Sequence, residues 1–219
     1  MRTINGVPII IMAYLSGQVF FTIAVSPLFL NILTAEKMGF VVGTATYGLS
    51  IGIIISVILG ILSSRTAMGL EIRSRGFKNI RTREDFEKMW RIQLYGCLDG
   101  VVAEPFWSGV VLSLLIAGFS LVGIPYIGSA ALAIAGRWLL HVVVHALLPG
   151  GIHGEGGAGS LDFIGIGLMF MDVINSLCFL ATGNIVAPII IHTFAGPFSQ
   201  LLGDKRRIAK RIGISLEEK

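Results

Sequence analysis

The sequence predicts an all-α protein, a polytopic membrane helix bundle of about six transmembrane helices. Hydrophobic residues make up 54% of the 219 residues and charged residues only 14%, with a mean hydropathy of +0.82. A soluble domain carries roughly 25% charged residues, so this composition is typical of a chain that lies mostly in lipid. The charges are also unevenly placed, because long stretches hold none. The length accommodates one domain of about six spans.

Six apolar segments are candidates for these spans. They are residues 8–33, 40–63, 94–121, 126–149, 161–181 and 184–203. The first is too long for a signal-peptide core and has no clear small-residue cleavage site, so we expect it to remain as a membrane anchor. The chain then divides into two N-terminal transmembrane helices (1–64), a basic loop (65–93), a four-helix core (94–203) and a basic tail (204–219).

The basic residues lie on one side of this arrangement. The loop and the tail hold Arg65, Arg73, Arg75, Lys78, Arg81, Arg83, Lys88, Arg91, Lys205, Arg206, Arg207, Lys210 and Arg211. The opposite connections, "TAEKMG", "GIP" and "ATG", hold only Lys37. The positive-inside rule therefore predicts that both termini and the long loop are cytoplasmic, in the plasma membrane if the source is prokaryotic. The net charge of +4 indicates contact with the lipid bilayer and no nucleic-acid partner.

The loop ends in "RTREDFEKMW" at residues 81–90. Thr82 and Asp85 form a capping pair, after which Phe86, Met89 and Trp90 share one helix face. This pattern predicts an interfacial helix that leads into the third span, with a solvated basic linker as the alternative.

Small residues and cysteines add little about function. Cys97 and Cys178 lie in apolar surroundings and indicate neither a disulfide framework nor a CxxC metal site. GxxxG pairs such as Gly48/Gly52 permit close helix contacts inside one subunit or between subunits, so the homo-oligomeric state stays open. The Gly-rich "GEGGAGS" predicts a loop.

Ionisable residues inside the spans are the candidate functional groups. In "RWLLHVVVH", Arg137, His141 and His145 stand at i, i+4 and i+8 and form one polar stripe on a helix. The other groups are Asp99, Glu104, Asp162, Asp172 and His192. Counted along the predicted spans, Glu104, His141, His145 and His192 fall in the inner half of the membrane, within a few helical turns of one another. Asp99 lies near the interface and receives no role.

One carboxylate and three imidazoles can serve several chemistries. His141, His145 and His192 could bind one zinc-like divalent metal ion with an open position for water, and Glu104 could take the proton of that water. Without a metal, Glu104 and a histidine could polarise water directly. The alternative is a structural ion pair between Arg137 and either Glu104 or Asp172.

Three segments resemble the motifs of the CAAX-protease and bacteriocin-processing family of intramembrane proteases (CPBP, or Abi). "TGNIVAPIIIHTFAG" at 182–196 resembles the last motif, with His192 on the family histidine. "AEPFWSG" at 103–109 resembles the first motif, Glu-Glu-x-x-x-Arg-Gly, with Glu104 on the second glutamate. "HVVVH" at 141–145 resembles the middle motif, Phe-x-x-x-His, with His145, or else His141, on the histidine.

The first and last motifs are degenerate. Ala103, Ser108 and Gly196 stand where the family has a glutamate, an arginine and an asparagine. The resemblance implies a membrane metalloendopeptidase in which Glu104 and His145 activate water and His192 stabilises the oxyanion. His141 and Arg137 would support the site or bind substrate, a peptide or a protein C-terminus. The alternatives are a non-catalytic immunity or scaffold protein on the same fold, and a small ion or solute transporter.

Overall fold

The computed structural model of the chain describes residues 3–4, 7–8, 16–20, 22–24, 34–75, 77, 80–97, 99–147 and 167–216. Of these, the side chains at 3–4, 7–8, 92–96, 145–147 and 168 lie outside the description. The described part is helical apart from two antiparallel two-residue strands, β1 (Thr3–Ile4) and β2 (Val7–Pro8). The predicted all-helical class is therefore confirmed in this part of the chain.

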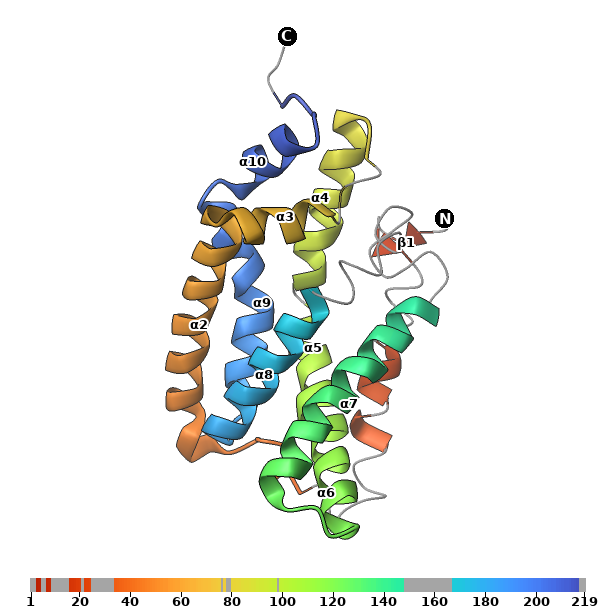
Figure 1. Cartoon of the computed structure of the whole chain (residues 1–219), viewed down its shortest axis with the longest axis vertical. Coiled ribbons are helices and arrows are strands. Elements are labelled where there is room, and N and C mark those ends of the chain that lie inside the picture. The colour runs from red at the N-terminus through yellow and green to blue at the C-terminus, as the bar shows by residue number, and fades with distance from the viewer. Residues whose placement is uncertain are drawn as a thin grey trace.

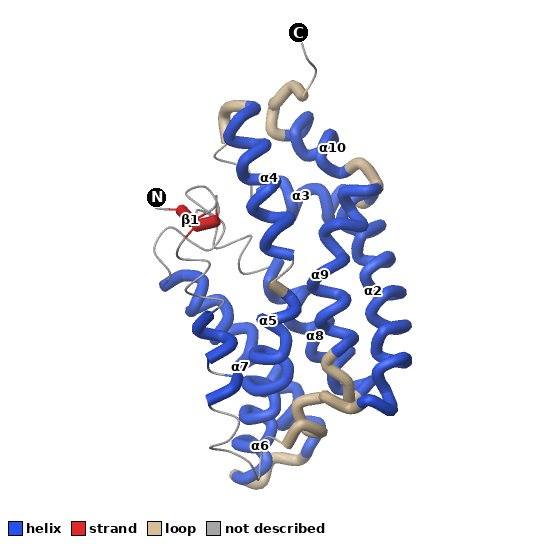
Figure 2. The backbone as a smooth tube through the Cα atoms, turned by 180° about the vertical axis from the view of Figure 1, so that it is seen from behind, coloured by secondary structure: helices blue, strands red, loops and turns tan. Residues whose placement is uncertain are grey.

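The longer helices run side by side, and the helices of residues 67–97 and 204–211 gather at one end of the molecule (Figures 1 and 2). In chain order they are η1 (Val42–Thr44), α2 (Ala45–Arg65), α3 (Ala67–Arg75), α4 (Arg83–Cys97), α5 (Gly100–Glu104), η2 (Pro105–Leu112), α6 (Ser113–Leu121), α7 (Tyr126–Leu147), α8 (Leu168–Thr182), α9 (Val186–Leu201) and α10 (Asp204–Arg211). Residues 16–20 and 22–24 are also helical.

Three helices in the described residues are long and apolar enough to cross a membrane: Val42–Arg65, Gly100–Leu121 and Tyr126–Val144. A fourth span results if α9 and α10, which meet at 75°, are counted together, and Met169–Thr182 is a shorter apolar helix. These helices overlap the predicted segments 40–63, 94–121, 126–149, 184–203 and the end of 161–181, but only three or four of them qualify as spans, so the predicted number of six is not confirmed. Most of segment 8–33 and residues 161–166 lie outside the described residues.

The contact between α2 and α9 depends on small residues. The buried residues of α2 are Gly48, Gly52, Ser56, Gly60 and Ser64, one on each turn of the helix. A Cβ atom added at Gly52 would lie 2.8 Å from Ile190 Cβ, so the two helices approach as closely as glycine allows. Gly48 and Gly52 therefore allow close packing between two parts of the same chain.

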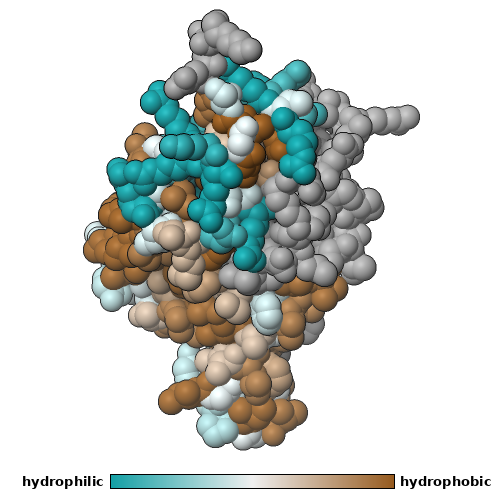
Figure 3. Space-filling view, turned by 45° about the horizontal axis from the view of Figure 1, so that its top comes forward, coloured by the Kyte–Doolittle hydropathy of each residue, from teal (hydrophilic) through white to brown (hydrophobic). Residues whose placement is uncertain are grey.

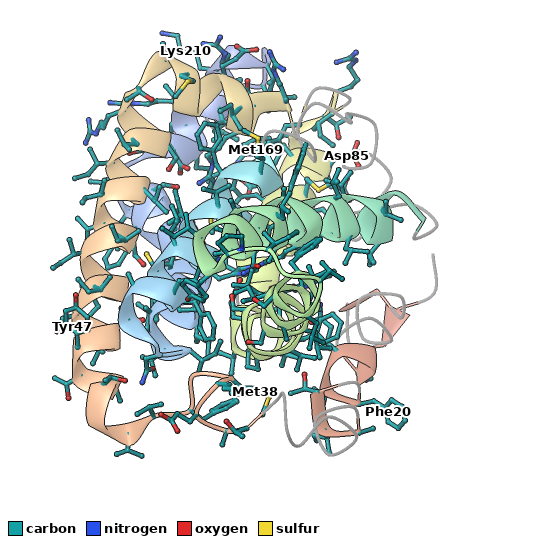
Figure 4. The ribbon with its side chains drawn as sticks, turned by 60° about the horizontal axis from the view of Figure 1, so that its bottom comes forward. Phe20, Met38, Tyr47, Asp85, Met169 and Lys210 are labelled. Atoms are coloured by element: carbon teal, nitrogen blue, oxygen red, sulfur yellow. The ribbon has the colours of Figure 1, made fainter. Side chains whose placement is uncertain are left out.

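The rest of the α2 surface is apolar and exposed. Ile54 and Tyr47 are 54% and 55% exposed, and Figure 4 shows Tyr47 pointing away from the bundle. An exposed apolar helix surface opposite a stripe of small residues is the pattern expected of a helix that faces lipid.

The connection between α8 and α9 fixes the start of α9. Gly183 adopts a left-handed conformation at φ +60° and ends α8. Asn184 Oδ1 then accepts the backbone N–H of Val186, and its Nδ2 donates to Val41 O at 2.6 Å. These bonds join the start of α9 to the segment that precedes α2. They therefore fix the position of His192 along the long axis of the bundle.

The charged end of the bundle is built by α3, α4 and α10, which we call the charged cap. Thr82 Oγ1 donates to Asp85 Oδ2 at 2.7 Å and accepts the Asp85 N–H at 3.1 Å, as the capping pattern predicts. Phe86 and Trp90 on the resulting helix α4 are 0% and 2% exposed. The helix is therefore confirmed and the solvated linker is wrong.

Phe86 and Trp90 of α4 pack within the protein, because Phe77 and Ile208 lie in the same buried cluster, and the interfacial position of the helix stays a prediction. Figure 3 shows hydrophilic residues gathered over this end and hydrophobic surface beside it. Arg73 pairs with the fully buried Asp204 at 3.0 Å, which ties α3 to α10 below this surface.

We expect Gly52→Ala to destabilise the protein by about 1–3 kcal/mol, because the new methyl group meets Ile190 and the Ala187 carbonyl oxygen at the α2–α9 contact. Thermal unfolding in detergent measures the change. Gly118→Ala on α6 is the matched control, since a Cβ atom there meets nothing within 4 Å. It should leave stability unchanged or raise it by about 0.5–1 kcal/mol. Equal effects of the two substitutions would contradict the proposed packing.

Candidate functional site

Arg137 on α7 is fully buried at the centre of a polar network between four helical segments. Its Nε donates to Asp172 Oδ1 on α8 at 3.1 Å. Its two terminal nitrogens donate to Ser108 at 2.6 Å, to Ser176 at 3.1 Å and to Glu104 at 3.1 and 3.3 Å. The guanidinium thus bridges two carboxylates on different helices and satisfies its donors with protein oxygens.

Glu104, at the end of α5, is 1% exposed. In addition to the hydrogen bonds from Arg137, its carboxylate accepts hydrogen bonds from Ser108 Oγ at 2.5 Å and from Asn175 Nδ2 at 2.7 Å. Its Oε1 lies 2.8 Å from His192 Nδ1. These partners approach both carboxylate oxygens and use nearly all of their lone-pair directions. Glu104 is therefore an anchored charge that has little capacity left to accept a proton from water.

His192 on α9 lies between two carboxylates. Its Nδ1 faces Glu104 Oε1 at 2.8 Å and its Nε2 is 3.0 Å from Asp99 Oδ1. The contact to Asp99 has ion-pair distance, and Asp99 Oδ1 is a buried oxygen for which no hydrogen bond to another described residue is found. The side chains of His192 and Asp99 are 22% and 15% exposed, against 1% for Glu104. This pair is therefore the more accessible edge of the network.

His141 lies on the other side of Arg137. Its Nδ1 is 3.1 Å from both Asp172 oxygens, and its ring stacks on Trp107 at a centroid distance of 4.4 Å. Hydrogen-bond contacts therefore connect His192, Glu104, Arg137, Asp172 and His141, and Asp99 joins them at ion-pair distance from His192.

The local sequence explains how the backbone brings these groups together. Pro105, directly after Glu104, has no backbone N–H, and residues Pro105–Leu112 form a π-helix. Gly100 lets α9 approach, since a Cβ atom there would lie 2.8 Å from His192 Cβ. The widened helix and the small residues leave room for the guanidinium and for the imidazole.

The network contains more acidic than permanently basic groups. Asp99, Glu104 and Asp172 are three carboxylates, and Arg137 is one fixed cation. An unbalanced charge is costly in an apolar bundle, and the two imidazoles lie in contact with these carboxylates. The cluster therefore holds groups that can take part in acid–base chemistry.

Three of the five residues predicted for the site come together directly: Glu104, Arg137 and His192. His141 joins them through Asp172, and both ion pairs that the sequence offered as alternatives for Arg137 are present. The side chain of His145 and all of Asp162 lie outside the described residues.

The sequence analysis missed Asp99 as a partner of His192, and it missed the polar side chains Ser108, Asn175 and Ser176. The spacing of these polar residues in the sequence could have identified them. Ser108 stands four residues after Glu104, and Asn175 and Ser176 stand three and four residues after Asp172, so each lies on the same helix face as a network carboxylate.

Among the described side chains, the structure does not place His141 and His192, two of the three predicted metal ligands, next to each other. His192 faces a carboxylate with each ring nitrogen, and the cation of Arg137 separates His192 from His141. The described residues contain no group of three His, Cys, Asp or Glu side chains that could hold a metal ion. A site that includes His145 stays a prediction of the sequence.

Comparison of the chain with protein-family models, with curated proteins and with solved structures finds no match.

We expect Arg137→Gln to destabilise the protein by about 3–5 kcal/mol, because it leaves Glu104 and Asp172 buried without their cation. Chemical unfolding in mixed micelles measures this loss. Lys88→Gln removes an exposed cation from α4 and should change stability by less than about 0.5 kcal/mol. Similar losses in both variants would mean that the network does not depend on Arg137.

Proposed function

We propose that the chain is an intramembrane peptide hydrolase in which Asp99 and His192 act on water and substrate while Glu104 positions His192. The observation that carries the proposal is the His192 ring, held between Glu104 at 2.8 Å and Asp99 at 3.0 Å. In this arrangement one carboxylate orients the imidazole and a second carboxylate lies beside it. Such an arrangement is suited to general acid–base catalysis.

Asp99 is the better candidate for the base. Glu104 already accepts hydrogen bonds from Arg137, Ser108 and Asn175, whereas Asp99 Oδ1 has no hydrogen-bond partner among the described residues. In the resemblance described above, Ala103 occupies the place of the water-activating glutamate. Asp99 precedes Ala103 by one helical turn and lies on the same side, so its carboxylate can take over that role.

The reaction then follows from the geometry. Asp99 takes a proton from water as the water oxygen attacks the carbonyl carbon of the substrate. His192, protonated between two carboxylates, donates a hydrogen bond to the carbonyl oxygen as it becomes negatively charged. The proton gathered on Asp99 passes to the leaving amine as the C–N bond breaks. Glu104 and Arg137 hold the imidazole in place and act as positioning residues.

The finer membrane arrangement belongs to the same proposal. We place six crossings in the chain, with both termini and the charged cap in the cytoplasm, because the basic residues of 65–91 and 205–211 lie at that end. Substrates would be peptides or protein C-termini that reach the site from the bilayer or from this side. The resemblance to the CAAX-protease and bacteriocin-processing family supports this substrate class.

A specific observation favours a second function, proton-coupled transport. Acids and histidines lie in contact on both sides of Arg137: Asp99, His192 and Glu104 on one side, and Asp172 and His141 on the other. Acids and histidines inside membrane spans often mark proton pathways in transporters, and here the fixed cation of Arg137 would divide the pathway into two parts.

We expect Asp99→Asn and His192→Gln each to lower peptide cleavage at least about 100-fold with little change in unfolding temperature, because each removes a group that transfers a proton. Incubation with prenylated and leader peptides, followed by mass spectrometry, measures cleavage. Asp85→Asn on α4 is the control, since it removes an exposed carboxylate outside the network. Full activity of Asp99→Asn would exclude Asp99 as the base.

Proteoliposomes that contain a pH-sensitive dye separate the two functions. Transport predicts that an imposed pH gradient decays in vesicles with the wild type and persists with His192→Gln. Hydrolysis predicts no decay in either case. Metal analysis of the wild type against His145→Ala tests the remaining three-histidine site, which requires a loss of about one bound divalent ion.

A further inference from the structure

Beyond the polar network, the charged cap holds a second candidate site on the outer side of α10. A groove of about 640 Å³ is lined by Arg206, Lys210, Gly213, Ile214, Ser215 and Leu216. It lies apart from the Arg137 network, and no proposed function described above uses it.

The five cations of residues 205–211 divide into two groups. Lys205 pairs with Glu87 at 2.6 Å, Arg207 donates to Ser64 O at 2.7 Å, and Arg211 pairs with Glu71. The hydrogen bonds from Arg211 and then from Arg75 lower the pKa of Glu71, so this carboxylate stays ionised and holds Arg211. These three cations fasten α10 to the bundle.

Arg206 and Lys210 form the second group. Both are exposed, and neither has a hydrogen bond or an ion pair to another described residue. They stand at i and i+4, so their charges lie on one face of α10, opposite the buried Ile208 and Ala209. Figure 4 shows Lys210 at the outer edge of the molecule, directed away from the bundle.

The groove combines these charges with apolar groups. Ile214 and Leu216 line it beside Arg206 and Lys210. A left-handed Gly213, at φ +79°, turns the chain back so that Ile214 and Leu216 come next to the helix. A ligand that matches the groove therefore has a negative charge and an adjoining apolar part.

The position of the groove identifies the source of such a ligand. Helix α10 begins three residues after α9 ends and turns by 75° from it, so it lies across the end of a membrane-spanning segment. Lipid headgroups occupy that level when α9 crosses a bilayer, and basic groups there attract anionic lipids.

We propose that Arg206 and Lys210 bind the phosphate of an anionic phospholipid, with Ile214 and Leu216 against its glycerol and upper acyl region. The lipid fixes the bent α9–α10 unit at the membrane surface. This site depends on the bundle lying in a bilayer and not on hydrolysis, so the failure of either proposal leaves the other intact.

Native mass spectrometry of the full chain in detergent tests the site, with dioleoylphosphatidylglycerol, dioleoylphosphatidylcholine and sn-glycerol 3-phosphate as separate probes. We expect phosphatidylglycerol to bind at least several-fold more tightly than phosphatidylcholine. The double variant Arg206→Gln/Lys210→Gln should lose about tenfold or more of this binding, because each cation near the surface contributes to headgroup attraction.

The control variant is Lys88→Gln/Arg91→Gln, which removes two exposed cations from α4 and leaves the groove unchanged. It should keep wild-type lipid binding. Equal losses in the two double variants would indicate diffuse attraction and overturn the proposal. Equal affinity for sn-glycerol 3-phosphate and phosphatidylglycerol would overturn it as well, since the apolar half of the groove would then contribute nothing. Unchanged unfolding temperatures establish that both variants are folded.

Discussion

The burial of one guanidinium determines how the bundle is assembled. Arg137 is fully buried in the middle of α7, and an isolated cation there is too costly to tolerate. The cost is offset only when α5 supplies Glu104 and α8 supplies Asp172 at hydrogen-bonding distance. Replacing such a network by apolar residues is often neutral or stabilising, so its presence indicates specificity or function more than stability. The network fixes the rotation of three helices about their own axes, which places each remaining polar group.

Small residues allow the helices to approach closely enough for this network to form. Gly52 allows α2 to pack against α9, and Gly100 allows α5 to pack against the Cβ atom of His192. If either helix were displaced by the width of a methyl group, the contact of 2.8 Å between His192 and Glu104 would be broken. The apolar helix α2 carries no residue of the network, yet it holds α9 at the height that the site requires. Packing and chemistry are therefore coupled through α9.

The sequence was sufficient to predict the helical class, the α4 cap at Thr82 and the proximity of Glu104 and His192, because composition, capping and span depth are local or one-dimensional properties. It could not choose between Glu104 and Asp172 as the partner of Arg137, since both lie within reach and the structure uses both. Asp99 was missed for a related reason. Its distance to His192 depends on the crossing of α5 and α9 at Gly100, and a chain position near a span end carries no information about such a crossing.

At each of the three positions where the chain departs from the resembled protease motifs, a group from elsewhere in the bundle lies nearby. Ser108 stands in place of the motif arginine, but Arg137 donates to Ser108 at 2.6 Å and reaches Glu104 from α7, so a guanidinium is still present at that position. Ala103 replaces a glutamate, and Asp99 supplies a carboxylate one turn away. Gly196 replaces the asparagine, and a Cβ atom there would lie 2.5 Å from Cys97 Sγ, so the thiol fills the space that a side chain would need. At two of these three positions a charge is supplied from a neighbouring residue, and at the third the Cys97 thiol occupies the space, so the packing of the bundle and not the local motif decides which groups surround Glu104 and His192.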